Sequence, residues 1–464
     1  MESLLSVGID IGTTTAQTVF SSLNVDNTAD CFKAPSVSIV SKEILYRGAV
    51  HGTPMKSDTL LDADSIVRLI QSDYKDAGIE PAAVDTGAVI ITGEAARKEN
   101  AAAVADKLSR FAGEFVVATA GPDLEAIIAG KGSGASDHSR AGLNTANLDI
   151  GGGTSNVALF RAGEPVATGC LDIGGRMLRT AGGRIDYMSP AARRIAAWCG
   201  ADVREGGGCD LTKLEQFADG LARILEQLFL LSPRTDVFRD VMTASSSDFM
   251  PAHPIQALTF SGGVSDIIYG NESDPFKYGD IGVILGRAIS RSRLMDLNVI
   301  RPGETIRATV VGAGTCSASI SGSTIFFDAE LLPLRNVPVL RLTSEEEQRI
   351  FTGEHDFLKK KLAWFMNQVG SSLVALAFTG ETSPSYERIK TLAGALSAVA
   401  QGTTILIIER DMAKALGQAL WQLNNKNLIV LDGIRTAAHD HIDIGRPLLG
   451  GLAVPVIVKT LIFG

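Results

Sequence analysis

The chain has 464 residues, of which 45% are hydrophobic and 20% are charged, and its formal net charge at pH 7 is −9. Such a chain is long enough for about two to four globular domains, and its negative charge argues against nucleic acid or an anionic membrane as the main partner. The N-terminus lacks the basic and apolar regions of a signal peptide, and no apolar stretch is long enough to span a bilayer, so we expect a soluble cytoplasmic protein.

The first half of the chain alternates strand-like and helix-like segments. In chain order, the pattern predicts a strand–turn–strand unit at 7–23, a helix at 62–78, a strand at 88–93, an alanine-rich helix at 94–113, a strand at 114–121, a short helix at 122–134 and a glycine-containing strand pair at 148–160. These assignments follow from hydrophobic periodicity and from proline and glycine at helix ends. The alternation favours an α/β architecture.

The second half combines a helical stretch with a further α/β unit. The pattern predicts mainly helix at 176–258 with an apolar stripe along 210–231, a strand and glycine turn at 254–266, a helix at 278–294, a strand- and turn-rich segment at 301–327 and a helix at 344–370. Strands at 371–378, 403–409 and 427–432 alternate with helices at 383–400 and 411–424. This alternation predicts a separate α/β unit at about 330–432.

The cysteines do not form a recognisable framework. They are odd in number, include no Cys-x-x-Cys pair and are scattered, at Cys31, Cys170, Cys199, Cys209 and Cys316. We therefore expect buried reduced thiols rather than disulfides or a zinc site.

The tripeptide Asp-Ile-Gly recurs along the chain, but only two copies share the same surroundings. Its copies begin at Asp10, Asp149, Asp172, Asp280 and Asp443. DIGTTT at 10–15 and DIGGGT at 149–154 each follow an apolar run, continue through small residues to threonine and lie between two predicted strands. These matched hairpins suggest a duplicated domain in which the two hairpins face each other.

Glycine-rich turns of this kind can bind phosphate. Without a Cβ, successive N–H groups can converge on phosphate oxygens, and an aspartate at the end of a strand can hold Mg2+ through its water shell. Two facing hairpins would then hold a polyphosphate and its metal from opposite sides. The alternative is that both are tight β-turns whose carboxylates accept hydrogen bonds from local N–H groups.

A third glycine motif, TFSGGVSDIIY at 259–269, follows another predicted strand. A flat base or a ribose could lie against its bare backbone. Other phosphate motifs are missing, because GxxxxGK[ST] does not occur and neither GKGSGA at 130–135 nor GAGTCS at 312–317 has the spacing of GxGxxG. The sequence therefore indicates neither a P-loop nor a Rossmann dinucleotide site.

Together, the three motifs resemble the nucleotide-binding motifs of the actin–Hsp70–sugar kinase superfamily. GIDIGTTTAQ resembles its first phosphate motif, LDIGGGTSNVALF its second and TFSGGVSDIIY its adenosine motif, over about residues 5–290. The resemblance implies a two-lobed α/β ATPase core at 1–295, with lobe I at about 1–145 and lobe II at about 146–295. A helical insertion is expected at about 180–255.

The resemblance also implies roles for individual residues. Asp10 and Asp149 would hold Mg2+ largely through water, and with Thr154, which would help to position the attacking water, they make up the expected catalytic set. The residues expected to bind ATP are Gly12, Thr13, Thr14, Thr15, Gly151, Gly152, Gly153, Gly174, Gly175, Gly262 and Gly263.

One position departs from the superfamily pattern. Hsp70-like members carry a glutamate directly before the proline of the connecting helix, whereas here Gly121 precedes Pro122. Glu125 lies three residues further on and is not expected to replace that glutamate. A slow ATPase that acts as a switch would fit this difference.

The whole chain, including its C-terminus, resembles the reactivating factors of adenosylcobalamin-dependent ethanolamine ammonia-lyase. This implies a chaperone-like protein with ATP and Mg2+ as cofactors and the lyase as partner, which releases damaged cobalamin so that intact coenzyme can enter. The region 296–464, with a strand-rich segment and a small α/β unit, would contact the lyase. The resemblance leaves open a homodimer and association with the ethanolamine-utilisation microcompartment. The alternatives are a small-molecule kinase and an actin-like nucleotide-dependent scaffold of the same superfamily.

The stretch AHDHIDIG at 438–445 holds His439, Asp440, His441 and Asp443, a set that could bind a metal or cobalamin. Its spacing differs from the cobalamin-ligand motif DxHxxG. We therefore expect a polar loop with solvated or locally hydrogen-bonded side chains, and cobalamin handled on the partner lyase.

Overall fold

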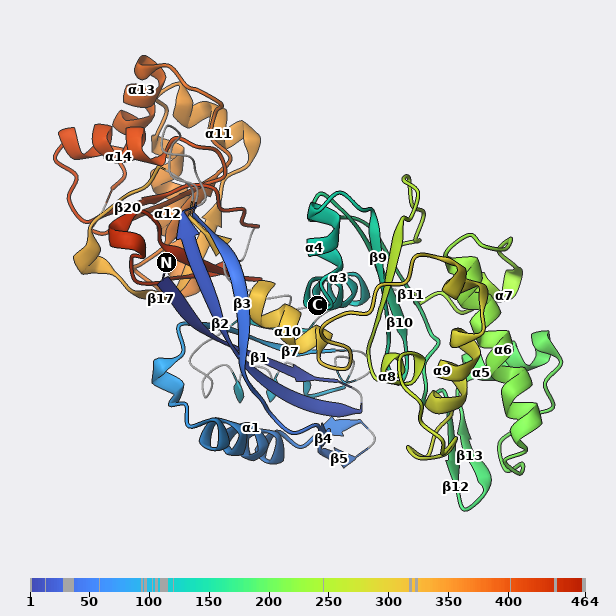
Figure 1. The fold of residues 1–464 in the computed structure, drawn as a ribbon. Helices are drawn as coiled ribbons and strands as arrows, with labels where there is room; N and C mark the ends of the chain where they lie inside the picture. The colour runs from blue at the N-terminus through green and yellow to red at the C-terminus, as the bar shows by residue number, and fades with distance from the viewer. Residues whose placement is uncertain are drawn as a thin grey trace.

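The computed structural model describes residues 2–460 apart from short gaps. The gaps are residues 13, 28–36, 58, 93–94, 96–97, 102, 105–106, 109–115, 120, 245, 317–318, 322–323, 401 and 438–439. Thr13, Cys31 and His439 therefore lie outside the described residues, as does much of the predicted helix at 94–113. Figure 1 shows two lobes side by side and a C-terminal unit beyond the first lobe.

The first lobe is built on a sheet with the strand order β3-β2-β1-β7-β8, in which β4 also pairs with β2. Its elements are β1 (Glu2–Ile11), β2 (Thr15–Asn27), β3 (Val37–Arg47), β4 (His51–Gly52), β5 (Met55–Ser57), β6 (Leu60–Leu61), α1 (Ala63–Ala77), β7 (Thr86–Ile91) and β8 (Val116–Thr119). β1 runs antiparallel to β2 and parallel to β7. Alternate side chains of β1, among them Ile9 and Ile11, pack against Ile66 and Ile70 of α1 in one buried core.

The second lobe repeats this arrangement. Its sheet has the order β11-β10-β9-β14, with β9 (Thr145–Ile150), β10 (Ser155–Arg161), β11 (Glu164–Leu171) and β14 (Ala257–Ser261). β9 runs antiparallel to β10 and parallel to β14, as β1 does to β2 and β7. The matched topology supports a duplicated unit in which β1–β2 and β9–β10 are equivalent hairpins.

The remaining elements of the second lobe pack on its sheet in one core. They are the hairpin β12 (Leu178–Ala181) and β13 (Arg184–Met188), and helices α5 (Pro190–Cys199), α6 (Leu211–Leu228), α7 (Asp236–Asp240), α8 (Ser265–Ile268) and α9 (Gly282–Ser290). The apolar stripe of α6 faces this core, as predicted. The prediction of mainly helix from residue 176 was wrong at its start, because Gly182 and Gly183, at φ of +55° and +74°, form a tight hairpin turn.

Two helices lie between the two sheets, α3 (Pro122–Gly132) and α10 (Ala308–Cys316) (Figure 1). α3, which is followed by the short α4 (Ala135–Arg140), packs on β9, β10 and β11, whereas α10 packs on β1, β2 and β7 and also against α3. Residues 308–316 were predicted as strand and turn, which was wrong. The run of valine and glycine suggested a strand. In the structure the glycine serves a helix instead, because the backbone of α10 contacts the backbone of α3 where the two helices cross. A Cβ on Gly312 would lie 2.0 Å from the Ile128 carbonyl oxygen.

The C-terminal unit has a sheet with the strand order β15-β22-β21-β17-β18-β19-β20-β16. Its strands are β15 (Ser319–Ile320), β16 (Phe326–Phe327), β17 (Leu334–Arg341), β18 (Ala375–Phe378), β19 (Thr404–Ile408), β20 (Leu428–Leu431), β21 (Asp440–Ile444) and β22 (Pro455–Thr460), and its helices are α11 (Ser344–Phe351), α12 (Asp356–Val369), α13 (Tyr386–Ser397) and α14 (Ala413–Gln422). β17 to β20 are parallel, with the predicted helices between them. The single helix predicted at 344–370 is instead two, because Gly353 adopts a φ of +93° and ends the first.

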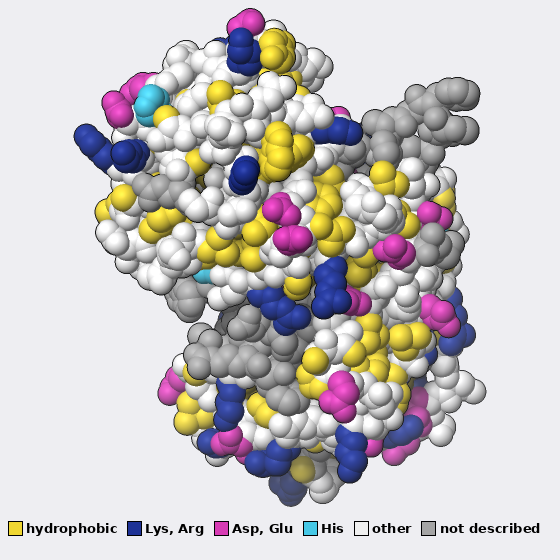
Figure 2. All heavy atoms as spheres, turned by 90° about the vertical axis from the view of Figure 1, so that its left-hand side faces the viewer, with side chains coloured by type: hydrophobic (Ala, Val, Ile, Leu, Met, Phe, Trp, Pro, Cys, Tyr) yellow, Lys and Arg dark blue, Asp and Glu magenta, His cyan; other side chains and the backbone are white. Residues whose placement is uncertain are grey.

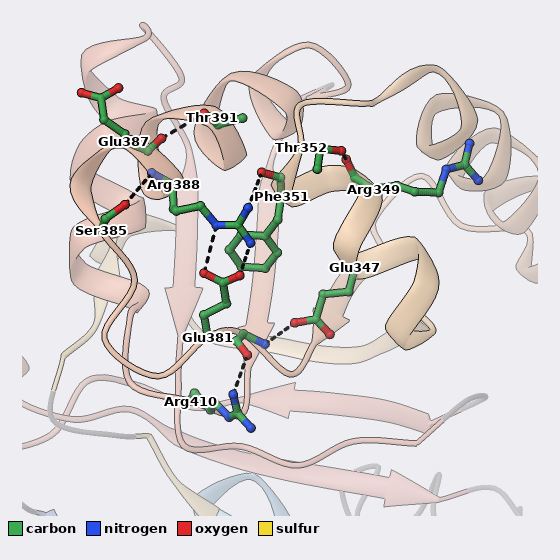
Figure 3. Close-up of polar contacts among 11 residues, drawn as sticks. Glu347, Arg349, Phe351, Thr352, Glu381, Ser385, Glu387, Arg388, Thr391 and Arg410 are labelled. Carbon is green, nitrogen blue, oxygen red and sulfur yellow. Dashed lines mark hydrogen bonds and ion pairs between the residues drawn. The ribbon is translucent and has the colours of Figure 1, made fainter.

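Charged residues near the carboxyl ends of these parallel strands are held by hydrogen bonds and an ion pair within the unit (Figure 3). The buried Glu347 carboxylate accepts a hydrogen bond of 2.6 Å from the Gly380 N–H, and Arg410 donates to the Gly380 carbonyl oxygen at 3.3 Å. Arg388 pairs with Glu381 and also donates to the carbonyl oxygen of Phe351. This network ties α11 and α13 to the loops after β18 and β19.

The surface and the thiols agree with the composition. On the face shown in Figure 2, acidic and basic side chains are interspersed over the C-terminal unit and the first lobe. Within the described part of the chain, no helix is long and apolar enough to cross a membrane. Cys170, Cys199 and Cys209 form no disulfide; Cys170 is buried and the other two are half-buried.

Candidate nucleotide site

A cavity of about 390 Å3 lies between the two lobes. Twelve of the predicted site residues line it: Asp10, Gly12, Thr14, Thr15, Asp149, Gly151, Gly152, Gly153, Thr154, Gly175, Gly262 and Gly263. Thr13 is outside the described residues. Gly174 does not line the cavity; it lies behind the second loop, where a Cβ would be 2.4 Å from the Gly152 carbonyl oxygen.

The two hairpin turns have the same geometry. The Gly12 N–H donates to the Thr15 carbonyl oxygen at 2.9 Å, and the Gly151 N–H donates to that of Thr154 at 3.0 Å. In the paired strands, Asp10 lies opposite Gln17 and Asp149 lies opposite Asn156. Each hairpin therefore presents an aspartate, a glycine turn and a threonine to the cavity in the same order.

The turns also touch each other. A Cβ on Gly152 would lie 2.8 Å from Thr14 Oγ1 of the other lobe, so only glycine lets the two loops approach this closely. Thr14 Oγ1 is buried and has no hydrogen-bond partner among the described residues.

Both aspartates are buried and accept hydrogen bonds from hydroxyl groups. Thr92 donates to Asp10 Oδ1 at 3.0 Å, and Ser261 donates to Asp149 Oδ1 at 2.5 Å. Burial, against the lowering effect of the Thr92 hydroxyl and with a smaller contribution from the Asp149 charge, raises the pKa of Asp10 to about 7. Burial likewise raises the pKa of Asp149 to about 6, although the Ser261 hydroxyl lowers it. Among the described residues, no positive charge stabilises the ionised form of either carboxylate.

Asp149 is held by a buried chain of hydrogen bonds along the second sheet. Asn147 donates to Ser261 Oγ at 2.9 Å, and the Thr259 hydroxyl donates to Asn147 Oδ1 at 2.8 Å. These residues alternate on β9 and β14, which are parallel neighbours. These hydrogen bonds orient the Ser261 hydroxyl toward the Asp149 carboxylate.

The third glycine motif forms another wall. Gly262 adopts a φ of +83°, and a Cβ there would lie 2.4 Å from the Ile150 carbonyl oxygen, so this position requires glycine. The nearest atom to a Cβ on Gly263 would be Ile306 Cδ1 at 3.9 Å, which leaves bare backbone facing open space. Val264, Ile267, Tyr278 and Ile306 complete a largely apolar wall that suits a flat aromatic base.

The cavity also contains residues that the sequence did not assign: Thr92, Glu125, Arg176, Ser261 and Asp280 line it or bond to residues that do. Glu125, in the first turn of α3, was not expected to replace the missing glutamate, yet it lies in the cavity wall. Asp280 begins another of the Asp-Ile-Gly copies, and Ser261 precedes the third glycine pair, so a signal for each was present in the sequence.

The oxygen atoms that line the cavity are suitable ligands for Mg2+, the metal that the resemblance implies. Two buried carboxylates, a hydroxyl oxygen that has no partner among the described residues and a glycine turn converge there, and Mg2+ prefers hard oxygen ligands with few protein carboxylates. No group of three or more His, Cys, Asp or Glu side chains in the described ranges could hold a metal ion. Mg2+ bound with a nucleotide would not need such a group, because phosphate and water supply the other oxygens.

The expectation of a polar loop at 438–445 was wrong for its described part. Residues 440–444 form strand β21, in which Ile442 and Ile444 are fully buried. Asp440 accepts from the Ala437 N–H at 2.5 Å and Asp443 from the Asn336 N–H at 2.6 Å. The carboxylates thus satisfy backbone donors at the ends of the strand.

Known proteins match this chain over nearly its whole length. Residues 2–464 match the family model for the ethanolamine utilisation protein EutA. Two relatives named ethanolamine ammonia-lyase reactivase EutA, from Escherichia coli strain K12 and Salmonella typhimurium strain LT2, are each 38% identical over 99% of this chain and 98% of their own length.

Similarity to solved structures is weaker. A Ppx/GppA family member from Aquifex aeolicus has a TM-score of 0.38 and 13% identity, over 68% of this chain and 98% of its own. The ethanolamine utilization protein EutJ from Carboxydothermus hydrogenoformans has a TM-score of 0.33 and 16% identity, over 68% of this chain and 90% of its own. The match of the family model and the identity to both relatives over their full length confirm the expected resemblance, and the chain belongs to the EutA family of ethanolamine utilisation proteins.

Proposed function

We propose that the chain is an ATP-dependent reactivating factor of ethanolamine ammonia-lyase. It binds ATP with Mg2+ between its lobes and uses hydrolysis to release damaged cobalamin from the inactivated lyase, so that intact adenosylcobalamin can enter. The names of the relatives support the lyase as partner. The observation that carries the nucleotide assignment is the pair of equivalent glycine hairpins that meet across one cavity, each with a buried aspartate.

The hairpins hold the phosphates in this proposal. The N–H groups of Thr14, Gly152 and Gly153 donate to phosphate oxygens, and the Thr14 hydroxyl gains the partner that the described protein atoms do not supply. Thr154 positions the attacking water, and Gly262 and Gly263 lie against the adenosine. Glu125, at the cavity wall, is a second group that could orient this water.

Asp10 and Asp149 hold Mg2+, largely through its water. When bound, Mg2+ would neutralise phosphate charge and stabilise the two ionised carboxylates, which would lower the pKa values that burial raises. The carboxylates must be ionised for this, so metal binding releases protons at pH values below about 7.

Hydrolysis changes how the lobes are held together. The terminal phosphate contacts both hairpins, one from each lobe, so its loss removes a bridge across the cavity. A ligand shifts such an equilibrium only through different affinity for the two states. The nucleotide state therefore changes the affinity of the chain for the lyase, and the C-terminal unit supplies the contact surface.

The test is a reactivation assay with the full-length chain. Ethanolamine ammonia-lyase inactivated with cyanocobalamin is mixed with the chain, ATP, Mg2+ and adenosylcobalamin, and ammonia release is followed. We expect recovery with the wild-type chain, none above background with Asp149→Asn, and full recovery with the control Asp137→Asn, whose carboxylate is exposed and pairs with Arg140.

Two outcomes would contradict the proposal in different ways. Recovery with Asp149→Asn would remove the carboxylate from the mechanism but keep the function. No recovery with any chain, while ATP is consumed, would reject the reactivase and direct attention to a phosphorylated product of a small-molecule kinase.

A further inference from the structure

Arg176 places a positive charge beside the second glycine loop. Its backbone N–H donates to the Gly152 carbonyl oxygen at 2.6 Å. Its Cγ and Cδ would lie 3.3 Å from a Cβ on Gly152, so the aliphatic part of the side chain runs along this loop. The backbone hydrogen bond and this packing fix the start of the side chain, and Arg176 lines the cavity.

The guanidinium is only loosely paired in the described structure. Arg176 Nε is buried but has no hydrogen-bond acceptor among the described residues. Asp280 Oδ2 lies 3.9 Å away, which is too far for a hydrogen bond. Asp280 is itself buried, and its other oxygen accepts from the Gly282 N–H at 2.8 Å, so its position is set by the backbone and not by Arg176.

Two buried donors that have no acceptor among the described residues therefore flank Gly152: the Arg176 Nε and the Thr14 hydroxyl of the other lobe. Leaving such donors unpaired is costly, and native proteins rarely do so without a ligand or water. A ligand that satisfies both must present several acceptor oxygens at the loop. A terminal phosphate presents several negatively charged oxygens, which suit a guanidinium better than the neutral acceptors of a base or a ribose.

We propose that Arg176 binds the terminal phosphate of the nucleoside triphosphate and stabilises the charge that develops as this phosphate is transferred to water. Asp280 is the positioning residue that holds the guanidinium toward the loop before the triphosphate binds. This inference rests on the proposed function, because it requires a nucleotide in the cavity.

The reaction that Arg176 assists is hydrolysis. A water oxygen forms a bond to the terminal phosphorus while the bond from this phosphorus to the bridging oxygen breaks, and the electron pair of that bond leaves with the nucleoside diphosphate. One water proton stays on the inorganic phosphate and the other passes to solvent. A planar guanidinium with several donors suits the equatorial oxygens of the transferred group.

The experiment compares full-length wild type, Arg176→Ala, Arg176→Lys and a matched control, Arg179→Ala. Arg179 lies on β12 over the ring of Tyr187, at 4.6 Å from its centroid, and does not line the cavity. Calorimetry with Mg2+ gives the affinity for ATP and ADP, and single-turnover phosphate release gives the rate of hydrolysis.

For Arg176→Ala we expect hydrolysis about 100-fold or more slower and ATP affinity about tenfold weaker, with ADP affinity within about threefold of wild type. Added guanidinium ion should restore part of the hydrolysis in Arg176→Ala but not in Arg176→Lys, whose side chain fills the space. Arg179→Ala should behave as wild type in both measurements.

Equal loss of ATP and ADP affinity in Arg176→Ala, without rescue by guanidinium ion, would mean that Arg176 only supports the loop. A wild-type rate of hydrolysis in Arg176→Ala would remove Arg176 from the reaction. Either result overturns this inference but leaves the proposed function standing. A wild-type chain that binds no ATP would overturn the proposed function together with the inference. A chain that hydrolyses ATP through Arg176 but reactivates no lyase would keep the inference and reject the reactivase.

Discussion

Two carboxylates buried within reach of each other are unfavourable for the metal-free protein. Asp10 is 8% exposed and Asp149 is 4% exposed, and the nearest stabilising groups are neutral hydroxyls. Selection for stability alone would favour neutral side chains here. The cost is understandable if the carboxylates bind a cation, since the same features that raise their pKa values make a strong site for Mg2+.

Replacing Asp10 with asparagine should therefore stabilise the metal-free chain at high pH. The pKa of Asp10 is raised from 3.8 to about 7, so between these values the folded chain holds a proton that the unfolded chain has released. The free energy of unfolding consequently decreases as the pH rises from about 4 to about 7. At pH 8 without metal, we expect Asp10→Asn to be more stable than wild type by about 2–4 kcal/mol, and the difference should vanish near pH 4.

Urea unfolding in EDTA at pH 8 and at pH 4.5 measures this difference. The control is Asp137→Asn, an exposed carboxylate, which should change stability by only a few tenths of a kcal/mol at either pH. An Asp10→Asn chain that is less stable than wild type at pH 8 would show that the ionised carboxylate has a stabilising partner in the fold.

The sequence predicted the residues that recur in motifs and missed those that act through tertiary contact. Both hairpins were predicted correctly because the turn chemistry is local: an aspartate, a glycine turn and a threonine between two apolar runs. Arg176 and Asp280 were missed because they reach the cavity from segments about 100 residues apart, which only the packing of the second lobe brings together. Thr92 lies at the end of a strand without any distinguishing neighbour.

At the scale of elements, the crossing of α3 and α10 sets how closely the lobes pack. A Cβ on Gly132 would lie 1.7 Å from the Ala308 carbonyl oxygen, and one on Gly312 would lie 2.0 Å from that of Ile128. The contacting atoms are backbone, so a side chain here cannot be accommodated by rotation of a neighbour. The two helices must separate, and with them the sheets on which they pack.

We expect Gly312→Ala to destabilise the chain by about 1–3 kcal/mol through this overpacking, and to weaken ATP binding because the hairpins move apart. The control is Gly394→Ala on α13, where no atom lies within 4 Å of the added Cβ. That change should stabilise by about 0.5–1 kcal/mol, because alanine favours a helix over glycine. Urea unfolding and ATP calorimetry measure both, and equal behaviour of the two variants would show that the crossing tolerates a wider spacing.

The same crossing explains why some elements could not be predicted from the sequence. The valine- and glycine-rich run of α10 has the local preferences of a strand, and only its contact with α3 makes small residues in a helix favourable. Residues 440–444 were expected in a polar loop, yet they form a strand whose carboxylates bond to backbone donors while Ile442 and Ile444 enter the core. Tertiary context overrode local preference in both segments.

At the scale of the whole molecule, the C-terminal unit docks on the first lobe away from the cavity. Leu448 packs with Leu4, Leu23 and Val25, which lie on β1 and β2. The same strand β1 carries Asp10 at its other end. Strand β1 thus connects the proposed nucleotide site to the unit proposed to contact the lyase, and we expect that the two activities can be separated at this contact.

Leu448→Asp should uncouple them. Burying a carboxylate among leucines and valine is costly, so the C-terminal unit should detach from the first lobe while both hairpins stay intact. We expect ATP hydrolysis within about threefold of wild type but reactivation of the lyase at least about tenfold weaker, with a larger radius of gyration in small-angle X-ray scattering. The control is Leu452→Asp, at a leucine that is 42% exposed, which should leave all three unchanged. If the unit detaches and reactivation stays at the wild-type level, the two lobes themselves bind the lyase. The effect of the nucleotide on the lyase would then not be transmitted through β1.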